Sequence, residues 1–432
     1  MTKKVLAVVI AAMMIIASFA ACGGDTSSKT ESTASKADTT ESTASAEETG
    51  LWDLGGEDNI TLKVWGPSTQ QDILKSQVDK FKALYPDVTM DIEVGLCEES
   101  EAQSQVRNDL SVAADLFAFP SDQLEAFVTS GSLDYVRNFG AVSAANDAGA
   151  VDAATYEGNL CAYPLTADNS YITFYDNTIF TEEDVKSLDK MCEVAAAAGK
   201  KIYVDAGNGF YSCLFSFTGG LRIEHDYATG TENHTFETDE ASVIATLKAF
   251  GDLFQSGTLV SAGTDVAVSA FSTDAAAIID GTWDVPAIEA LLGDKMGAAK
   301  LPTINVNGED KQIYNLFGYK VLGVKSGSAF PNTAHALAEF LTGKDCQTEK
   351  AEQFKIGPSN LEAAQSDVVV NNAVLKAVSE QAKFSIPQKS IASGFWNAHK
   401  AIGLYISEIG SDLSDDALKA QLDACLEATN DI

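Results

Sequence analysis

The 432-residue chain is poor in basic residues and in histidine. It carries 29 Lys and Arg against 62 Asp and Glu, a formal net charge of −33, and four His. Nucleic-acid binding relies on Lys and Arg that displace counterions from phosphates, so this charge argues against a nucleic-acid partner. The acidity favours a well-solvated surface, with a surface that matches a basic partner as the alternative.

The sequence also lacks the common catalytic and nucleotide-binding motifs. No G-x-S-x-G, H-E-x-x-H, P-loop or EF-hand pattern occurs, and the four His lie far apart in the chain. Paired carboxylates for glycoside hydrolysis stay open as an alternative because acidic residues are plentiful. We therefore predict a protein that is not an enzyme and holds no cofactor or metal.

Cysteines are few and show no C-x-x-C spacing. After Cys22, six are scattered through apolar segments: Cys97, Cys161, Cys192, Cys213, Cys346 and Cys425. This scatter favours buried free thiols, whereas disulfides are the alternative for an exported chain.

The N-terminus has the pattern of a secretory signal over residues 1–21. Lys3 and Lys4 precede the apolar run "VLAVVIAAMMIIASFAA", whose 17 residues leave a membrane anchor as the alternative. "FAAC" resembles the lipobox of bacterial lipoproteins, although Phe19 replaces the usual Leu. The resemblance implies that Cys22 is lipidated and holds the protein on the outer face of the cytoplasmic membrane, as in a Gram-positive envelope.

Residues 22–59 are mostly Ser, Thr, Ala, Gly and charged residues, so we expect a disordered linker. From Ile60 on, strand and helix patterns alternate. "ITLKVW" and "VTMDIEV" alternate apolar with polar residues, whereas 71–85 has apolar residues at helical spacing. This order predicts an α/β fold of two lobes, each with a mostly parallel sheet flanked by helices.

Aromatic residues follow several predicted strands. Trp65, Phe119, Trp283 and the pair Phe210–Tyr211 stand at four strand ends, with polar neighbours such as Ser121 and Asp122. Ligands of open α/β sheets bind beyond the carboxyl ends of strands. Flat rings beside short polar side chains suit sugar rings, which have apolar faces and hydroxyl edges.

Six segments, taken in order, resemble the maltose/maltodextrin-binding group of the extracellular solute-binding proteins of ABC importers. They are "LKVWGP", "DLFAFPSDQLEAFVTSGSL", "YEGNLCAYPLTADNSYITFYDN", "IIDGTWDVPAI", "GAAKLPT" and "IPQKSIASGFWNAHKAI". The resemblance implies a two-lobe periplasmic-binding-protein-like fold, joined by crossing hinge segments, that closes on malto-oligosaccharide in an interlobe cleft. It also implies an ABC permease as partner and a monomeric protein.

The resemblance further implies sugar-contacting residues. Phe119 takes the place of a stacking Trp, Asp122 matches a sugar-binding Asp, and Gln123 replaces an Arg. A hinge Glu falls on Asp168 or Asn169, and Trp283 and Trp396 match two stacking tryptophans. The full expected carbohydrate-binding set is Trp65, Ser68, Gln70, Phe119, Ser121, Asp122, Gln123, Asp168, Asn169, Phe210, Tyr211, Trp283, Phe395 and Trp396.

The expected first lobe comprises 60–167 and 318–356, and the second 168–317 and 357–432. The crossings are expected near 166–169, 315–318 and 355–360, where Gly357 and Pro358 favour a turn. Two alternatives stay open: a binding protein for a different oligosaccharide, such as a xylo-, galacto- or host-glycan-derived one, and a lipoprotein sensor or adhesin without transport.

Overall fold

The structure, a computed structural model, describes residues 51–226, 229, 231–389 and 391–429. The predicted signal peptide, Cys22 and most of the predicted linker lie outside these residues. None of the helices in the described part is long and apolar enough to span a membrane.

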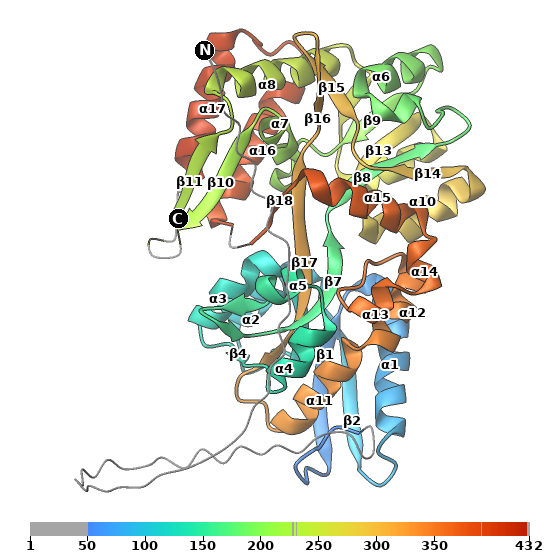
Figure 1. The fold of residues 1–432 in the computed structure, drawn as a ribbon, viewed down its shortest axis with the longest axis vertical. Coiled ribbons are helices and arrows are strands. Elements are labelled where there is room, and N and C mark those ends of the chain that lie inside the picture. Colours follow the sequence, from blue (N-terminus) through green and yellow to red (C-terminus); the bar gives the residue numbers. More distant parts are fainter. Residues whose placement is uncertain (1–50, 227–228, 230, 390, 430–432) are drawn as a thin grey trace, which may run out of the picture. The chain divides into compact units, whose positions relative to one another are not determined.

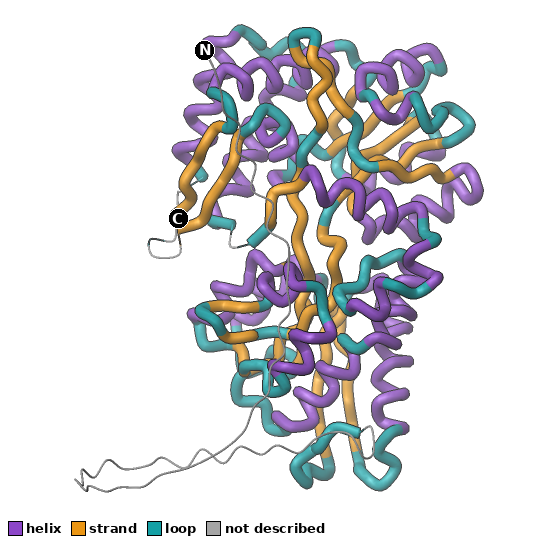
Figure 2. The backbone as a smooth tube through the Cα atoms, viewed as in Figure 1, coloured by secondary structure: helices purple, strands orange, loops and turns teal. Residues whose placement is uncertain are grey.

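The first lobe is built on a seven-stranded sheet with the strand order β18-β17-β3-β1-β2, and with β4 and β7 also paired to β17. Its edge strand β18 pairs with the end of β17 that lies in the second lobe. Its strands are β1 (Ile60–Gly66), β2 (Met90–Leu96), β3 (Leu116–Pro120), β4 (Leu133–Asp134), β7 (Tyr163–Asn169), β17 (Asn315–Lys325) and β18 (Ser385–Pro387). A short hairpin, β5 (Thr155–Tyr156) and β6 (Asn159–Leu160), accompanies it. Figure 2 shows helices along this sheet.

The helices of the first lobe supply apolar stripes to its core, such as Leu74, Val78 and Phe81 of α1. They are η1 (Ser68–Gln70), α1 (Gln71–Ala83), η2 (Glu99–Glu101), α2 (Ala102–Asn108), η3 (Ser121–Gln123), α3 (Leu124–Thr129), α4 (Phe139–Ala145), α5 (Ala148–Ala153), α11 (Pro331–Leu341), α12 (Lys344–Phe354), α13 (Leu361–Ala364) and α14 (Asp367–Val370).

The second lobe is built on a five-stranded sheet with the order β12-β9-β13-β8-β14. Its strands are β8 (Tyr171–Asp176), β9 (Lys201–Val204), β12 (Leu259–Ser261), β13 (Ala275–Gly281) and β14 (Met296–Ala299). Alternate residues of β8 enter two different cores, because successive side chains of a strand point to opposite faces. Helices therefore cover both faces of this sheet.

The remaining elements of the second lobe are two hairpins and the covering helices. They are β10 (Leu221–Asp226), β11 (Thr231–Phe236), β15 (Thr303–Val306), β16 (Glu309–Gln312), η4 (Asp184–Lys186), α6 (Leu188–Ala197), α7 (Gly209–Phe217), α8 (Glu240–Gln255), α9 (Thr264–Ser269), η5 (Ala270–Ser272), η6 (Thr282–Asp284), α10 (Val285–Leu292), η7 (Gly293–Lys295), α15 (Ala373–Gln381), η8 (Ala382–Phe384), α16 (Ser393–Ser407) and α17 (Asp415–Ala428).

The paired strands β7 and β17 run between the two lobes (Figure 1). Leu316 of β17 lies in the core of the second lobe, whereas Val321 and Val324 lie in the core of the first. Likewise β7 ends at Asn169 in the first sheet, and β8 begins the second sheet two residues later. Two of the lobe connections are therefore strands rather than loops.

The third passage lies further along the chain than we expected. Residues assigned to the second lobe from 357 on stay with the first: Pro358 bridges to Thr166 and Asn360 to Asn146. Helices α13 and α14 pack on α12, whereas α15 packs on β14 and β8. Gly357 and Pro358 do not form the expected turn between the lobes, because they pair with Ala167 and Thr166 of β7. The chain thus passes to the second lobe between α14 and α15.

The α/β class is confirmed, but the sheets are mixed rather than mostly parallel. β1 pairs in parallel with β2 and β3, and β9 with β12 and β13. β17 pairs antiparallel with β3 and β7, and β8 with β13 and β14. The antiparallel ladders arise where strands enter a sheet from the other lobe.

The last part of the predicted linker is folded. Leu54 is buried, and the Trp52 ring packs edge-on against Phe340, with 6.0 Å between centroids. The Glu57 carboxylate accepts hydrogen bonds from the backbone N–H groups of Asn332 and Thr333, at 3.0 and 2.9 Å. Residues 51–59 therefore cap the N-terminus of α11, and composition alone concealed this role.

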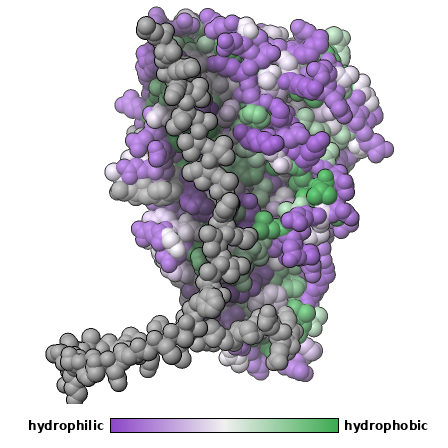
Figure 3. All heavy atoms as spheres, in the orientation of Figure 1, coloured by the Kyte–Doolittle hydropathy of each residue, from purple (hydrophilic) through white to green (hydrophobic). Residues whose placement is uncertain are grey.

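The six described cysteines are free and buried, as the sequence predicted. Burial raises the pKa of each thiol, for example that of Cys192 to about 12. Figure 3 shows mostly hydrophilic residues on the visible part of the surface, in line with the acidic composition.

We predict that Glu57→Ala destabilises the protein. The change removes a carboxylate that satisfies two N–H groups at a helix N-terminus, and such a cap contributes about 1–2 kcal/mol. Urea unfolding followed by circular dichroism measures the loss. Asp87→Ala, at an exposed loop carboxylate, is the control, and equal stability of the two variants would contradict the capping role.

Candidate functional site

Three half-buried aromatic rings of the second lobe lie together, and we call them the aromatic cluster: Phe210 of α7, Trp283 of η6 and Trp396 of α16. Ring centroids are 5.9 Å apart for Phe210 and Trp283, and 6.4 Å for Phe210 and Trp396. The rings come from segments far apart in sequence. The fold thus collects three of the predicted site residues on one partly exposed surface.

Local structure fixes these positions. Trp283 directly follows β13, as the sequence predicted, and Phe210 lies in the first turn of α7. A Cβ atom on Gly209 would lie 2.1 Å from the carbonyl oxygen of Trp396. Only glycine allows α7 and α16 to approach this closely, and the approach brings Phe210 and Trp396 together.

Asp168, near the end of β7, joins the crossing strand to the aromatic cluster. Its side chain is 2% exposed, and its Oδ2 accepts hydrogen bonds from Thr282 Oγ1 at 3.0 Å and from the Gly357 N–H at 2.8 Å. Burial raises the pKa of Asp168, while Lys320 opposes that rise. Asp168 thereby holds η6, and with it Trp283, against the crossing strand.

Gln388, just after β18, connects the next residues of the candidate site. Asn169 Nδ2 donates to Gln388 Oε1 at 2.7 Å, and Gln388 Nε2 donates to Asp122 Oδ1 at 3.0 Å. Ser121 Oγ donates to the Gln388 carbonyl at 3.3 Å. Burial raises the pKa of Asp122 to about 7, and the bond from Gln388 opposes this rise.

Lys320 of β17 contacts both lobes. Its ammonium pairs with Glu99 of η2, and it lies 5.3 Å from the ring centroid of Trp283. Burial lowers the pKa of Lys320, but Glu99 and Asp168 together outweigh burial and raise it. The lysine is therefore held as a cation between a first-lobe carboxylate and a second-lobe ring.

Three predicted aromatic residues are buried instead of lining the site. Phe119 packs against Phe127 with centroids 4.5 Å apart, because β3 is covered on both faces. Tyr211 donates its hydroxyl to Asp280 Oδ1 at 2.8 Å, and the Phe395 ring stacks on His399 at 4.0 Å. Tyr211 and Phe395 pack edge-on against Phe210 and Trp396 of the aromatic cluster, whereas Phe119 belongs to the core of the first lobe.

The other predicted residues lie on the first lobe. Ser121 is buried, and Gln123 donates to the Ser100 carbonyl at 3.1 Å. The Ser68 N–H donates to Glu98 Oε1 at 2.9 Å, which joins η1 to the segment before η2. These residues form one rim of the first lobe beyond the ends of β1 and β3.

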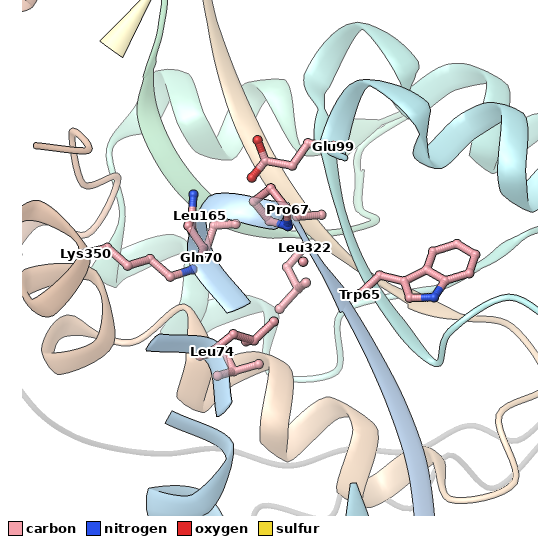
Figure 4. A pocket seen from close by; sticks show the side chains of 11 residues that line it. Trp65, Pro67, Gln70, Leu74, Glu99, Leu165, Leu322 and Lys350 are labelled. Atoms are coloured by element: carbon pink, nitrogen blue, oxygen red, sulfur yellow. The ribbon is translucent and has the colours of Figure 1, made fainter. Parts of the chain in front are cut away.

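Trp65 and Gln70 line a small cavity of about 20 Å³ in the first lobe, together with Glu99 and Lys350. Figure 4 shows Lys350 reaching toward Gln70, whereas the Trp65 ring points away from both. Lys350 is 6% exposed, and burial lowers its pKa. The cavity holds about one or two water-sized groups and is far too small for a sugar ring.

Sequence reasoning missed Lys320, Glu99 and Gln388. Lys320 is the charged residue within an otherwise apolar strand, "FGYKVLG", which is a usable signal. Gln388 stands in the quoted segment "IPQKS", yet nothing local indicates that its amide reaches Asn169 and Asp122. Both contacts depend on pairings more than 200 residues apart.

The arrangement suits noncovalent binding. It offers aromatic faces, an amide and carboxylates, the groups that hold the apolar faces and hydroxyls of a polar ring. Within the described ranges no group of three His, Cys, Asp or Glu could hold a metal ion.

Known proteins resemble the chain along most of its length. The galactooligosaccharide-binding protein of Bacillus subtilis (strain 168) is 25% identical over 346 residues, 76% of this chain and 80% of that protein. A solved complex with acarbose is 26% identical, with a TM-score of 0.76 over 85% of this chain and 98% of that one. The maltodextrin-binding protein from L. casei BL23 without ligand, at 24% identity, shares the fold with a TM-score of 0.73 over 86% and 99%.

A family model described as bacterial extracellular solute-binding protein matches residues 76–377. The relationship inferred from the six sequence segments is confirmed. Such proteins bind solutes rather than convert them, in agreement with the expectation of no enzymatic activity. The chain belongs to the bacterial extracellular solute-binding protein family.

Proposed function

We propose that this chain is the oligosaccharide-binding component of an ABC importer. The observation that carries the proposal is the aromatic cluster, whose half-buried rings are tied to the crossing strand β7 by the bond from Thr282 to Asp168. The next residue of β7, Asn169, bonds to Gln388, which in turn bonds to Asp122. Sugar rings would stack on Trp283 and Trp396, and their hydroxyls would donate to Asp122. Family membership and relatives that bind oligosaccharides support this assignment.

Malto-oligosaccharides are the first proposed ligands, because the sequence segments match the maltodextrin-binding group. A similar solved structure is a complex with acarbose. Galacto-oligosaccharides are the second, since a relative that covers most of the chain is named for them. Both fit the same chemistry of stacked rings and hydroxyl acceptors.

The proposed mechanism is closure of the two lobes about the crossing strands. The aromatic cluster would hold the sugar on the second lobe, and the rim with Ser68, Gln70, Ser121, Asp122 and Gln123 would close from the first. Lys320 contacts both sides through Glu99 and Trp283, so movement at the hinge would alter the setting of the Trp283 ring. The closed protein, a monomer, would then dock on the permease.

We further propose that Cys22 carries a lipid anchor and that the linker up to residue 50 tethers the binding domain at the membrane surface. Metabolic labelling with palmitate tests this directly. Label on the native chain that is absent from Cys22→Ala supports anchoring, and label on neither chain refutes it.

We predict saturable binding of maltotriose or longer maltodextrins to the purified protein, read by Trp fluorescence and calorimetry. Cellobiose and xylobiose should not bind. Binding of galacto-oligosaccharides alone would keep the fold and mechanism but replace the substrate. If none of the glycans tested binds, the result contradicts a sugar-binding role and favours a sensor or adhesin.

We predict that Trp283→Ala weakens sugar binding by about 1–3 kcal/mol, the scale of losing one stacked aromatic face. Calorimetric titration measures the change. Trp52→Ala is the matched control, because Trp52 packs on Phe340 in the first lobe and touches none of the cluster. If the folded Trp283 variant binds sugar with unchanged affinity, the result contradicts a stacking role for this ring.

We predict that affinity falls as the pH falls through 7. Burial raises the pKa of Asp122 to about 7, so the carboxylate that accepts sugar hydroxyls is mostly ionised at pH 8 and mostly protonated at pH 6. Only the ionised fraction binds, which makes binding about tenfold weaker at pH 6 than at pH 8. Asp122→Asn should abolish this dependence, and a flat profile of the native protein would exclude Asp122 as the acceptor.

A further inference from the structure

Gln388 occupies a junction of segments that are far apart in sequence. Its side chain is 5% exposed, and its two amide ends have different partners. Oε1 accepts from Asn169 on the crossing strand β7, and Nε2 donates to Asp122 on the first lobe. Its backbone N–H donates to Phe317 of β17 at 2.8 Å, which continues the pairing of β18 with β17.

Close packing adds to these bonds. A Cβ atom on Gly318 would lie 2.5 Å from Gln388 Oε1, so the glycine makes room for the amide against β17. The backbone carbonyl of Gln388 accepts from Ser121, the neighbour of Asp122. The amide is therefore fixed against both crossing strands, while its nitrogen is directed at the carboxylate.

We infer that Gln388 is a positioning residue for ligand binding: its amide nitrogen fixes the orientation and ionisation of Asp122 and ties that carboxylate to the crossing strands. The inference rests on the proposed function in one respect, the role of Asp122 toward the ligand. The contact itself does not depend on which sugar binds. Neither the sequence resemblance nor the comparisons assign a role to this residue.

The titratable side chains next to the partners of Asp122 along the chain have partners of their own. Lys320 of β17 pairs with Glu99 of η2, Lys389 pairs with Asp152 at 2.8 Å, and the Tyr319 hydroxyl donates to Asp147 at 3.2 Å. The neutral Gln388 amide is thus the side-chain donor that the structure gives to Asp122. A donor to the ionised form stabilises that form, so its removal raises the pKa of the carboxyl group.

Gln388→Glu tests the two contacts of the amide separately, because it keeps the contact to Asn169 and removes the one to Asp122. A carboxylate oxygen still accepts from Asn169, whereas the donor to Asp122 is replaced by a second negative charge. Gln388→Met removes both bonds at similar volume. Gln77→Met is the matched control: Gln77 is also buried, but its amide donates to the Cys346 carbonyl within the first lobe, away from the crossing strands.

The test is the ionisation of Asp122, followed by NMR of 13C-carboxyl-labelled aspartate in the ligand-free protein and assigned with Asp122→Asn. We expect both Gln388 variants to move the Asp122 midpoint upward by about one pH unit or more, and Gln77→Met to leave it in place. An unchanged midpoint in a folded Gln388 variant overturns the inference. If Gln388→Glu fails to fold, the Gln388→Met titration decides.

Binding measured between pH 6 and pH 8.5 supplies the second readout. We expect the affinity of Gln388→Met to approach that of the native protein at high pH, to fall below it by about fivefold at pH 7 and by about tenfold at pH 6, since a higher Asp122 midpoint leaves less ionised carboxylate. An equal loss at every pH indicates a merely structural role and overturns the inference. If no glycan binds the native protein, the proposed function fails, and the ligand-free titration still judges Gln388.

Discussion

The antiparallel pairing of β7 with β17 is the constraint on which the rest of the structure depends. β17 has residues in the cores of both lobes, and β7 leads directly into β8 of the second sheet, so the two cores are joined through paired strands rather than through flexible loops. Register shifts occur at Gly318 and Lys320, where the pair passes between the lobes. A passage built this way limits relative movement of the lobes to bending of a two-stranded ribbon, which is the motion a hinge requires.

The same passage holds the polar part of the candidate site. Asp168 and Asn169 end β7, and Lys320 lies on β17, so all three keep a fixed relation to the hinge. A buried charge is tolerated only with partners, and here the partners come from both lobes: Thr282 and Gly357 for Asp168, Glu99 and Trp283 for Lys320. The need to satisfy these charges therefore couples the setting of the aromatic rings to the hinge.

Much of the local structure could be predicted from sequence, because it depends on near neighbours. The alternation in "ITLKVW" gave β1, and an apolar run followed by Gly281 placed Trp283 just after β13. The prediction of an exposed Phe119 ring was wrong. "LFAF" is apolar throughout, and such a run does not reveal that both faces of its strand are covered. The turn expected at 357–358 was wrong, because these residues pair with β7. Where the chain leaves the first lobe depends on the packing of α13 and α14, which no local pattern encodes.

The long-range contacts explain why an amide, rather than a cation, faces Asp122. A lysine or arginine would neutralise the carboxylate and occupy its lone pairs, as Glu99 is occupied by Lys320. Gln388 contributes one N–H to Oδ1 and carries no charge, so Asp122 retains acceptor capacity for hydroxyl groups. A sugar brings no charge to offset burial, and the site consequently needs a strong acceptor that is held in place without being neutralised. The crossing strands supply that support through the bonds of Gln388 to Asn169 and Phe317. Gln388 therefore connects the proposed hinge to the proposed ligand contact, Asp122.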